Sequence, residues 1–373
     1  MLTDVHLKHT EELYTTPIVQ QTALWSEVKH RLGSETLAVQ FSAEQGDLFE
    51  GRGTGRFGSD LLVVVHQINA QECIAYVPYG PELEPDEPFQ GLFLEELSEC
   101  LRSFLPLSCI LIRYDLCWES YWARDPEYFD AQGHFTGEPA AGSCEIRFNF
   151  STVNGNFRKT LYNFLPAHTF YLDLRPEPEQ MLRNMKPKTR YNIGLAGRKG
   201  VTVRSSGWED MNIWYRLYTE TAGRNHIRLH EQRHFEALLS ARDALSDNAG
   251  RAELLIAEHQ GVPLAAMFLT LTGNRGSYLF GASSGTGRNL MAPYALQWEA
   301  ILRSRKCGCT EYDMFGTAPA PDPSHPLYGL YKFKAGFGGE VVRYVGAYDY
   351  VYQPRLLRLA RAAWRLRQGR LGA

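Results

Sequence analysis

PLAAMFLTL (263–271) begins the stretch that decides the fold, which continues through SYLFG (277–281), YALQWEAILRS (294–304) and TEYDMFG (310–316). The first, second and last of these segments are short apolar runs with β-branched and aromatic residues, which predict strands. The third segment predicts a helix, because its large apolar side chains recur at helical spacing. The stretch therefore predicts a β-hairpin, a crossover helix and a closing strand, in a mixed sheet that helices cover.

An earlier stretch repeats this order. It reads LLVVVHQI (61–68), CIAYVPYG (73–80), FLEELSECLRSFL (93–105) and CILIRYD (109–115). Gly80 precedes Leu101 by 21 residues, as Gly281 precedes Leu302; both helices contain Leu-Arg-Ser and both closing strands contain Tyr-Asp. Matching order and spacing indicate a duplicated module. The unit fits the acyltransferase fold called GNAT, so we expect an α/β (α+β) protein of two tandem GNAT-like domains with mixed sheets.

A domain boundary is predicted near residues 150–166, where VNGNFRKTLYNFLP loses its periodicity. At 373 residues the chain exceeds the usual size of one domain. We expect a first domain over 1–165, a second over 166–340, and a C-terminal stretch, 341–373, that packs on the first. At the start of the second domain TFYLDL (169–174) predicts a strand, and PEPEQMLRNM predicts a helix with acidic residues in its first turn.

The composition is that of an ordinary globular protein. Hydrophobic residues make up 44% and charged residues 22%, which excludes a disordered or fibrous chain. The start has no basic segment followed by an apolar run, and no apolar stretch approaches the roughly 18 residues of a spanning helix. With seven cysteines and no spaced set of metal ligands around Cys307-Gly-Cys309 or the histidines, we expect a cytoplasmic protein without a metal site.

Positive charge is concentrated in two segments of a chain whose net charge is −3, which predicts contacts with anions at both. Residues 183–204 carry seven cations and no acid, and residues 355–370 carry six arginines and no acid. A helix beginning near Pro187 would add its charges to free N–H groups at its N-terminus and suit phosphate; a solvated basic helix is the alternative. The tail is a candidate to lie on the inner membrane surface, to offer arginines to tRNA, or to dock on the protein with a solvated basic face.

Several motifs carry a resemblance to a known family. They are QTALWSEVK (21–29), AYVPYGP (75–81), IRYD (112–115), KPKTRYNIGLAGRKGV (186–201), YLFGASS (278–284), APYALQWEAI (292–301), EYDMFG (311–316) and LYGLYKFKAGFGG (327–339). The chain resembles the Fem family of peptidoglycan-bridge enzymes (FemA, FemB, FemX), tandem-GNAT aminoacyltransferases that use aminoacyl-tRNA. FemA and FemB carry a coiled-coil arm, whereas residues 205–250 have no sustained heptads. The resemblance is therefore to the compact FemX type.

The resemblance implies transfer of an amino acid from aminoacyl-tRNA to the side-chain amine of residue 3 of a peptidoglycan precursor stem peptide. The acceptor would be a UDP-linked muropeptide or lipid II. No cofactor is implied beyond aminoacyl-tRNA as co-substrate, and a monomer is expected.

The same resemblance implies roles for individual residues. Lys29 of the first domain and Arg190 of the second would hold the diphosphate of the precursor, and Lys334, paired with Phe333, would stabilise the oxyanion of acyl transfer. Asp115 matches a candidate general base, although Asp313 at the equivalent place in the second copy favours a structural role for the repeated Tyr-Asp. The remaining candidate substrate contacts are Trp25, Lys188, Tyr191 and Tyr278.

Two other functions stay open. The loop Ser283-Ser-Gly-Thr-Gly-Arg288 precedes the second helix, where an ordinary GNAT protein grips the pyrophosphate of acetyl-CoA, so a CoA-dependent N-acyltransferase is one alternative. The loop departs from the usual Gln/Arg-x-x-Gly-x-Gly/Ala signature. The other alternative is a non-catalytic protein that binds a cell-wall precursor.

Overall fold

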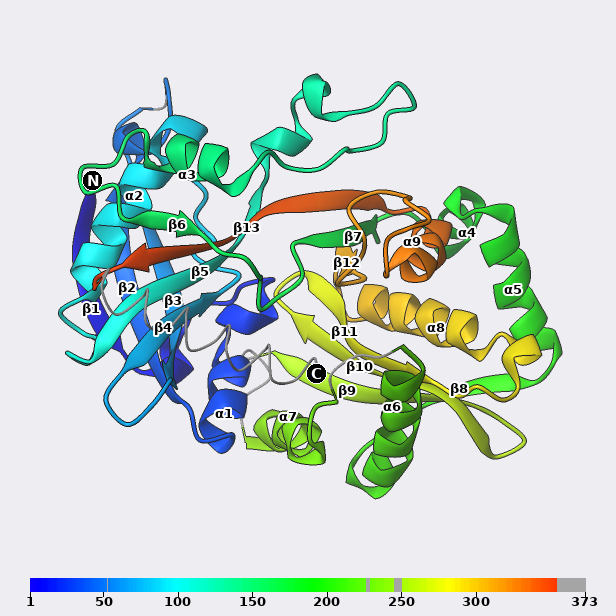
Figure 1. The fold of residues 1–373 in the computed structure, drawn as a ribbon. Coiled ribbons are helices and arrows are strands. Elements are labelled where there is room, and N and C mark those ends of the chain that lie inside the picture. The colour runs from blue at the N-terminus through cyan, green and yellow to red at the C-terminus, as the bar shows by residue number, and fades with distance from the viewer. Residues whose placement is uncertain (52, 226–228, 245–249, 354–373) are drawn as a thin grey trace, which may run out of the picture.

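The two predicted repeats form equivalent halves of one mixed sheet in a computed structural model (Figure 1), which describes all residues except 52, 226–228, 245–249 and 354–373. In each half an antiparallel hairpin is followed by a crossover helix and a parallel closing strand. The first unit comprises β3 (Arg56–Gln67), β4 (Cys73–Pro78), α2 (Glu87–Leu101) and β5 (Cys109–Glu119). The second comprises β10 (Val262–Thr272), β11 (Arg275–Ser283), α8 (Ala292–Lys306) and β12 (Glu311–Asp313). The predicted fold class is confirmed.

The boundaries of two elements differ from the prediction. Helix α2 begins at Glu87 and ends at Leu101, whereas the apolar run predicted 93–105; Pro88 fits the first turn of a helix, so the helix starts before its apolar stripe. Strand β12 covers three residues only, because Asp313 turns the chain: its carboxylate accepts the Phe315 N–H, and Phe315 has φ 58°.

Further strands extend each half of the sheet. The full order is β1-β2-β3-β4-β5-β13-β7-β12-β11-β10-β9-β8, with β6 paired to β13. The added strands are β1 (Leu2–Lys8), β2 (Glu35–Glu44), β6 (Phe157–Lys159), β7 (His168–Asp173), β8 (Val201–Ser206), β9 (Arg251–His259) and β13 (Glu340–Val351). The remaining helices are α1 (Ala23–Arg31), α3 (Ala141–Asn149), α4 (Pro178–Asn184), α5 (Pro187–Arg198), α6 (Met211–Asn225), α7 (Gln232–Ala244) and α9 (Tyr328–Lys334).

Strand β13 joins the two halves (Figure 1). Its first part, Glu340–Arg343, pairs with β7 of the second half, and its later part, Tyr344–Val351, pairs with β5 of the first. The C-terminal stretch therefore returns to the first half as a strand as far as Val351. The predicted basic tail, 355–370, lies outside the described residues.

Three apolar clusters form most of the core. One fills the first half between the sheet and α2 and α3, and another fills the second half beneath α5 and α8. The third belongs to both halves: Leu24 and Trp25 of α1 pack with Trp214 of α6, Phe235 of α7 and Phe268 of β10. Because α1 lies against α7, this shared core holds the two halves together. No helix within the described ranges is both long and apolar enough to cross a membrane.

Candidate functional site

Lys29 lies where the two halves meet. It follows Trp25 by one helical turn on α1, and the Thr22 hydroxyl caps that helix by accepting the Trp25 N–H at 3.3 Å. The ammonium sits over the Trp25 ring, 4.9 Å from its centroid, and no acidic side chain among the described residues forms an ion pair with it. Burial lowers the pKa of Lys29. A half-buried cation without a counter-ion favours binding of an anion.

Two histidines lie close enough to Lys29 to respond to its charge. His66 is at the end of β3 and His234 is on α7, so one comes from each half. Burial, followed by the charge of Lys29, lowers the pKa of His66 to about 4, and burial with His230 and Lys29 lowers that of His234 to about 3. Both rings are therefore neutral at pH 7 and can each donate one hydrogen bond. Sequence reasoning missed both residues, although a histidine that ends a run of buried strand residues was a usable signal.

Asp115 holds the connection between the two halves. It is 1% exposed, and its Oδ2 accepts hydrogen bonds from the Tyr76 hydroxyl at 2.7 Å and from the backbone N–H groups of Phe164 and Leu165 at 3.0 and 2.9 Å. Burial raises the pKa of the carboxyl group. Asp313, the repeated residue, likewise accepts from the Thr169 hydroxyl and the Phe315 N–H. Both aspartates thus anchor backbone that leaves or enters the sheet, as the repeat itself suggests.

Lys334 is a buried cation of the second half. It ends α9, is 2% exposed, and donates hydrogen bonds from Nζ to the carbonyls of Phe315 and Gly316 at 2.7 and 2.6 Å. Burial lowers its pKa to about 7, against the opposing effect of Asp313. Nζ lies 5.5 Å from the centroid of the Tyr278 ring. Two of its three N–H groups are used, so one remains for a developing negative charge.

Phe333 and Tyr278 surround this lysine in different ways. Phe333 packs against Tyr294 of α8 and Phe337, with ring centroids 5.0 and 5.3 Å apart, and so fixes α9 on α8. Tyr278, on β11, contributes its ring face to Lys334, while burial raises its pKa to about 12. Phe333 therefore positions the helix that carries Lys334.

A row of contacts connects the Lys29 region to Lys334. The His66 and Tyr76 rings are 5.7 Å apart, and Tyr76 donates to Asp115. Tyr79 comes next: its ring lies 6.0 Å from that of Phe315, whose carbonyl accepts from Lys334. Tyr79 has φ 50° and its hydroxyl donates to the Pro166 carbonyl at 2.5 Å. The row of contacts therefore runs from the Lys29 region past Asp115 to Lys334, along the junction of the two halves.

Arg190 is not part of this junction. It lies on α5, which packs on α8 and β8 at the far edge of the second half, away from α1 (Figure 1). Its guanidinium is exposed and donates to the carbonyls of Leu182, Arg183 and Met185 at the end of α4. The structure thus does not place it beside Lys29 to share one diphosphate.

The basic helix α5 presents an exposed surface. Pro187 occupies its first turn, as predicted. Lys186, Lys188, Arg190 and Arg198 are exposed, as is Tyr191 at 59%, and no acid within the described part of the chain pairs with any of these cations. Such a surface suits a polyanion.

The loop that would grip a pyrophosphate in a CoA enzyme is occupied by a carboxylate. Glu220 of α6 accepts a short hydrogen bond from the Gly285 N–H and further hydrogen bonds from the Ser284 hydroxyl at 3.4 and 3.2 Å. Helix α8 follows with Met291 before it at φ 57°. A carboxylate at this position repels phosphate, which disfavours the CoA-dependent alternative.

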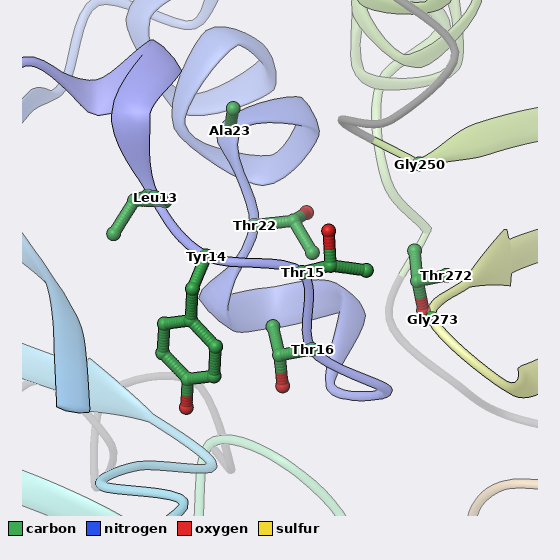
Figure 2. Close-up of a pocket in the computed structure, with 9 residues that line it drawn as sticks. All are labelled: Leu13, Tyr14, Thr15, Thr16, Thr22, Ala23, Gly250, Thr272 and Gly273. Carbon is green, nitrogen blue, oxygen red and sulfur yellow. The ribbon is translucent and has the colours of Figure 1, made fainter. Parts of the chain in front are cut away.

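A small cavity marks the seam between the halves. Figure 2 shows Thr15 and Thr22 of the N-terminal segment facing Gly250, Thr272 and Gly273 of the second half. Its volume is about 10 Å³, which holds about one water molecule. The Thr272 hydroxyl donates to the Pro17 carbonyl at 3.1 Å. The cavity is therefore part of the interface and too small for a substrate.

The family of the chain follows from its sequence. The FemAB family model matches residues 160–243 and 240–365, which together make up more than half of the chain. The chain belongs to the FemAB family. The resemblance drawn from the sequence motifs is thus confirmed.

Two curated relatives match the FemAB protein over a limited region. The Lipid II:glycine glycyltransferase of Staphylococcus epidermidis is 36% identical over 107 residues, 29% of this chain and 26% of that protein. The enzyme of the same name from Staphylococcus aureus is 34% identical over 108 residues, again 29% and 26%. The chain matches about a quarter of the length of these relatives.

A solved structure shares the whole fold. The crystal structure of FemX superposes with a TM-score of 0.70 at 16% identity, covering 96% of this chain and 99% of that one. At this identity the likeness concerns the fold, and it extends across both halves of the FemAB protein described above.

Proposed function

We propose that the chain is an aminoacyltransferase that moves an amino acid from aminoacyl-tRNA to the side-chain amine of residue 3 of a peptidoglycan precursor stem peptide. Family membership supports an enzyme of this class, and the relatives named Lipid II:glycine glycyltransferase support a precursor of this kind as acceptor. The observation that carries the proposal is the row of contacts along the junction of the two halves, with a half-buried Lys29 that has no acidic partner among the described residues at one end and a buried Lys334 held by two carbonyls at the other.

Lys29 would bind the negatively charged part of the precursor. Its ammonium has no acidic partner in the described part of the chain, and its stem and the Trp25 ring provide an apolar wall. The neutral rings of His66 and His234 can add hydrogen bonds to phosphate without repelling a second cation. Arg190 would act elsewhere, because it lies on the exposed surface of α5.

Lys334 would serve the chemical step. The acceptor amine attacks the ester carbonyl carbon of aminoacyl-tRNA, a C–N bond forms, and the C–O bond to the tRNA ribose breaks. The amine loses a proton and the ribose oxygen gains one. The oxyanion that forms in between is stabilised by a fixed cation in a dry site, and Lys334 is held for this by two carbonyls.

The exposed cations of α5 would contact tRNA phosphates. Three basic side chains of α5 and Lys186 at its N-cap, without acidic partners among the described residues, are opposite in charge to a nucleic-acid backbone. The acceptor is a UDP-linked muropeptide or lipid II, which share the stem peptide and the diphosphate.

An assay with two donors and two acceptors tests the proposal. Purified protein is incubated with aminoacyl-tRNA or acetyl-CoA, and with UDP-linked pentapeptide or lipid II, and products are identified by mass. Transfer from aminoacyl-tRNA supports the proposal, and the preferred acceptor distinguishes the two precursors. Transfer only from acetyl-CoA would refute the proposed function. Tight precursor binding without transfer would favour a non-catalytic binding protein instead.

Substitution of Lys29 separates binding from chemistry. Lys29→Met should weaken precursor binding by about tenfold to a hundredfold, because a charge-assisted hydrogen bond to phosphate is lost. Arg31→Met is the matched control: it lies on the same helix, but its guanidinium pairs with Glu27 at 2.7 Å. Equal precursor affinity in both variants would remove Lys29 from the site.

A further inference from the structure

The chain bulges where it leaves β12, and the bulge carries both carbonyls that bind Lys334. Two N–H groups after β12 donate to two carbonyls of β7, in the pairs Met314–Phe170 at 2.9 Å and Thr317–His168 at 3.0 Å. The chain advances three residues between these donors but only two between the acceptors, so one residue is extra, as in a β-bulge. Phe315 and Gly316 lie inside it, and their carbonyls accept from Lys334 Nζ at 2.7 and 2.6 Å.

The conformation of the bulge needs support from outside. Phe315 has φ 58°, a left-handed conformation that a bulky side chain keeps only where its surroundings enforce it. On one side, Oδ1 of Asp313 accepts the Phe315 N–H at 2.8 Å and a hydrogen bond from the Thr169 hydroxyl of β7. On the other side, the Tyr79 ring of the first half lies 6.0 Å from the Phe315 ring. The direction of the two carbonyls therefore depends on one carboxylate oxygen and one ring contact.

The same carboxylate lies close enough to Lys334 to affect its charge. Asp313 opposes the effect of burial on the pKa of Lys334, whereas Tyr278, whose ring faces Nζ, stays neutral because burial raises its pKa to about 12. Burial raises the pKa of Asp313 itself, and Arg275 of β11, the Thr169 hydroxyl and Lys334 act against that rise. The other titratable groups that face Asp313 are tyrosines whose pKa burial raises, namely Tyr79, Tyr171 of β7 and Tyr344 of β13.

We propose that Asp313 is a positioning residue for Lys334: its carboxylate, supported by the Thr169 hydroxyl, holds the bulge whose two carbonyls orient the ammonium. The effect of this role on turnover rests on the proposed function, but the contacts concern the folded chain alone. Asp115, the same residue of the first repeat, lies within β5, which continues as one strand as far as Glu119. The repeated aspartate therefore has different tasks in the two copies.

The consequence can be measured on Lys334 itself. Asp313→Asn keeps the size of the side chain and an acceptor oxygen but removes the charge that favours the ammonium. The titration midpoint of the Lys334 Cε signal, in the full chain labelled with ¹³C-lysine, should therefore fall by about one pH unit. The signal is assigned by its absence from Lys334→Met. Asp115→Asn is the matched control. An unchanged midpoint in Asp313→Asn, or an equal fall in Asp115→Asn, overturns the proposal.

Thr169 tests the support separately from the charge. Thr169→Val removes the hydroxyl at similar volume, so the carboxylate loses a hydrogen bond that favours its ionised form. The Lys334 midpoint should fall by less than in Asp313→Asn, and Thr169→Ser, which keeps the hydroxyl, should restore it. Both variants keep every charge of the chain, so they also decide the matter if Asp313→Asn does not fold. Equal midpoints in the valine and serine variants overturn the proposal.

The pH profile of single-turnover transfer connects this role with the proposed function. Because Lys334 would act as a cation, Asp313→Asn should move the alkaline limit of transfer to lower pH by about the same one unit. The affinity for the precursor should stay unchanged. A lowered midpoint without any transfer from aminoacyl-tRNA would support the positioning role but refute the proposed function. A transfer profile that moves while the midpoint stays in place would refute the positioning role alone.

Discussion

Replacing Lys334 by methionine should make the protein more stable and much less active. The pKa of Lys334 falls from an ordinary value of 10.5 to about 7 on burial, and this difference corresponds to about 5 kcal/mol. The variant avoids that cost but loses the hydrogen bonds to the carbonyls of Phe315 and Gly316, at about 1–1.5 kcal/mol each. We therefore expect a net gain of about 2 kcal/mol at pH 7.

The difference in stability between Lys334→Met and the wild type should depend on pH. The pKa of Lys334 is lower in the folded state, so the unfolded state binds more protons between pH 7 and about 10.5. The wild type thus gains stability as the pH rises through that window, by at most about 1.4 kcal/mol per pH unit, and the variant lacks this gain. The advantage of Lys334→Met should shrink from pH 7 to pH 9.

Urea unfolding at pH 7, 8 and 9 measures the stability difference, and single-turnover transfer measures the chemistry. Turnover should fall about 10²–10³-fold, as for loss of an oxyanion donor. Lys332→Met is the control, because this lysine lies on the same helix but is exposed. A variant less stable than wild type by several kcal/mol would refute the burial argument, and unchanged turnover would refute the catalytic role.

Three further outcomes follow from other parts of the fold. Asp115→Asn should lower the free energy of unfolding by about 2–3 kcal/mol, because Oδ2 accepts three hydrogen bonds. Turnover per folded molecule should stay unchanged. A loss of turnover without loss of stability would instead support Asp115 as the general base. Gly273→Ala should cost more than Gly261→Ala in thermal unfolding. Both glycines have positive φ, a conformation that costs an alanine about 1–2 kcal/mol at either position. Only at Gly273 would the added Cβ also meet the N-terminal segment, at 3.0 Å. Equal losses of stability in the two variants would argue against a rigid interface between the halves. Replacing Lys188 and Arg190 together by glutamine should reduce the slope of log affinity for tRNA against log salt by about 1.5; an unchanged slope would exclude α5 from tRNA binding.

The sequence predicts the scaffold well and the site only in part. Hairpin, helix and closing strand are local patterns, so the duplicated unit could be recognised twice over. The burial of Lys334 could not be predicted from the sequence, because it depends on how the chain turns back at Phe315 and Gly316 after β12. A family motif identifies a lysine but does not determine its pKa.

Distances between halves are likewise hidden from the sequence. His234 is far from Lys29 in the chain and approaches it because α7 packs on α1, whereas His66 approaches it from β3 of the same half. Arg190 illustrates the opposite case: its motif suggested a partner for Lys29, whereas α5 packs at the outer edge of the second half. A family resemblance identifies which residue to consider, but the packing of the helices and strands determines which residues lie next to it.

The shared strand β13 sets the order of events during synthesis. Strand β5 ends at Glu119, but its partner begins at Tyr344, so at about 5–20 residues per second the edge of β5 stays unpaired for roughly 10–45 s on the ribosome. An open edge of this kind invites pairing with another nascent chain. The first half therefore completes its sheet only after the second half has been made, and early termination before β13 should leave aggregation-prone fragments in place of a folded N-terminal domain.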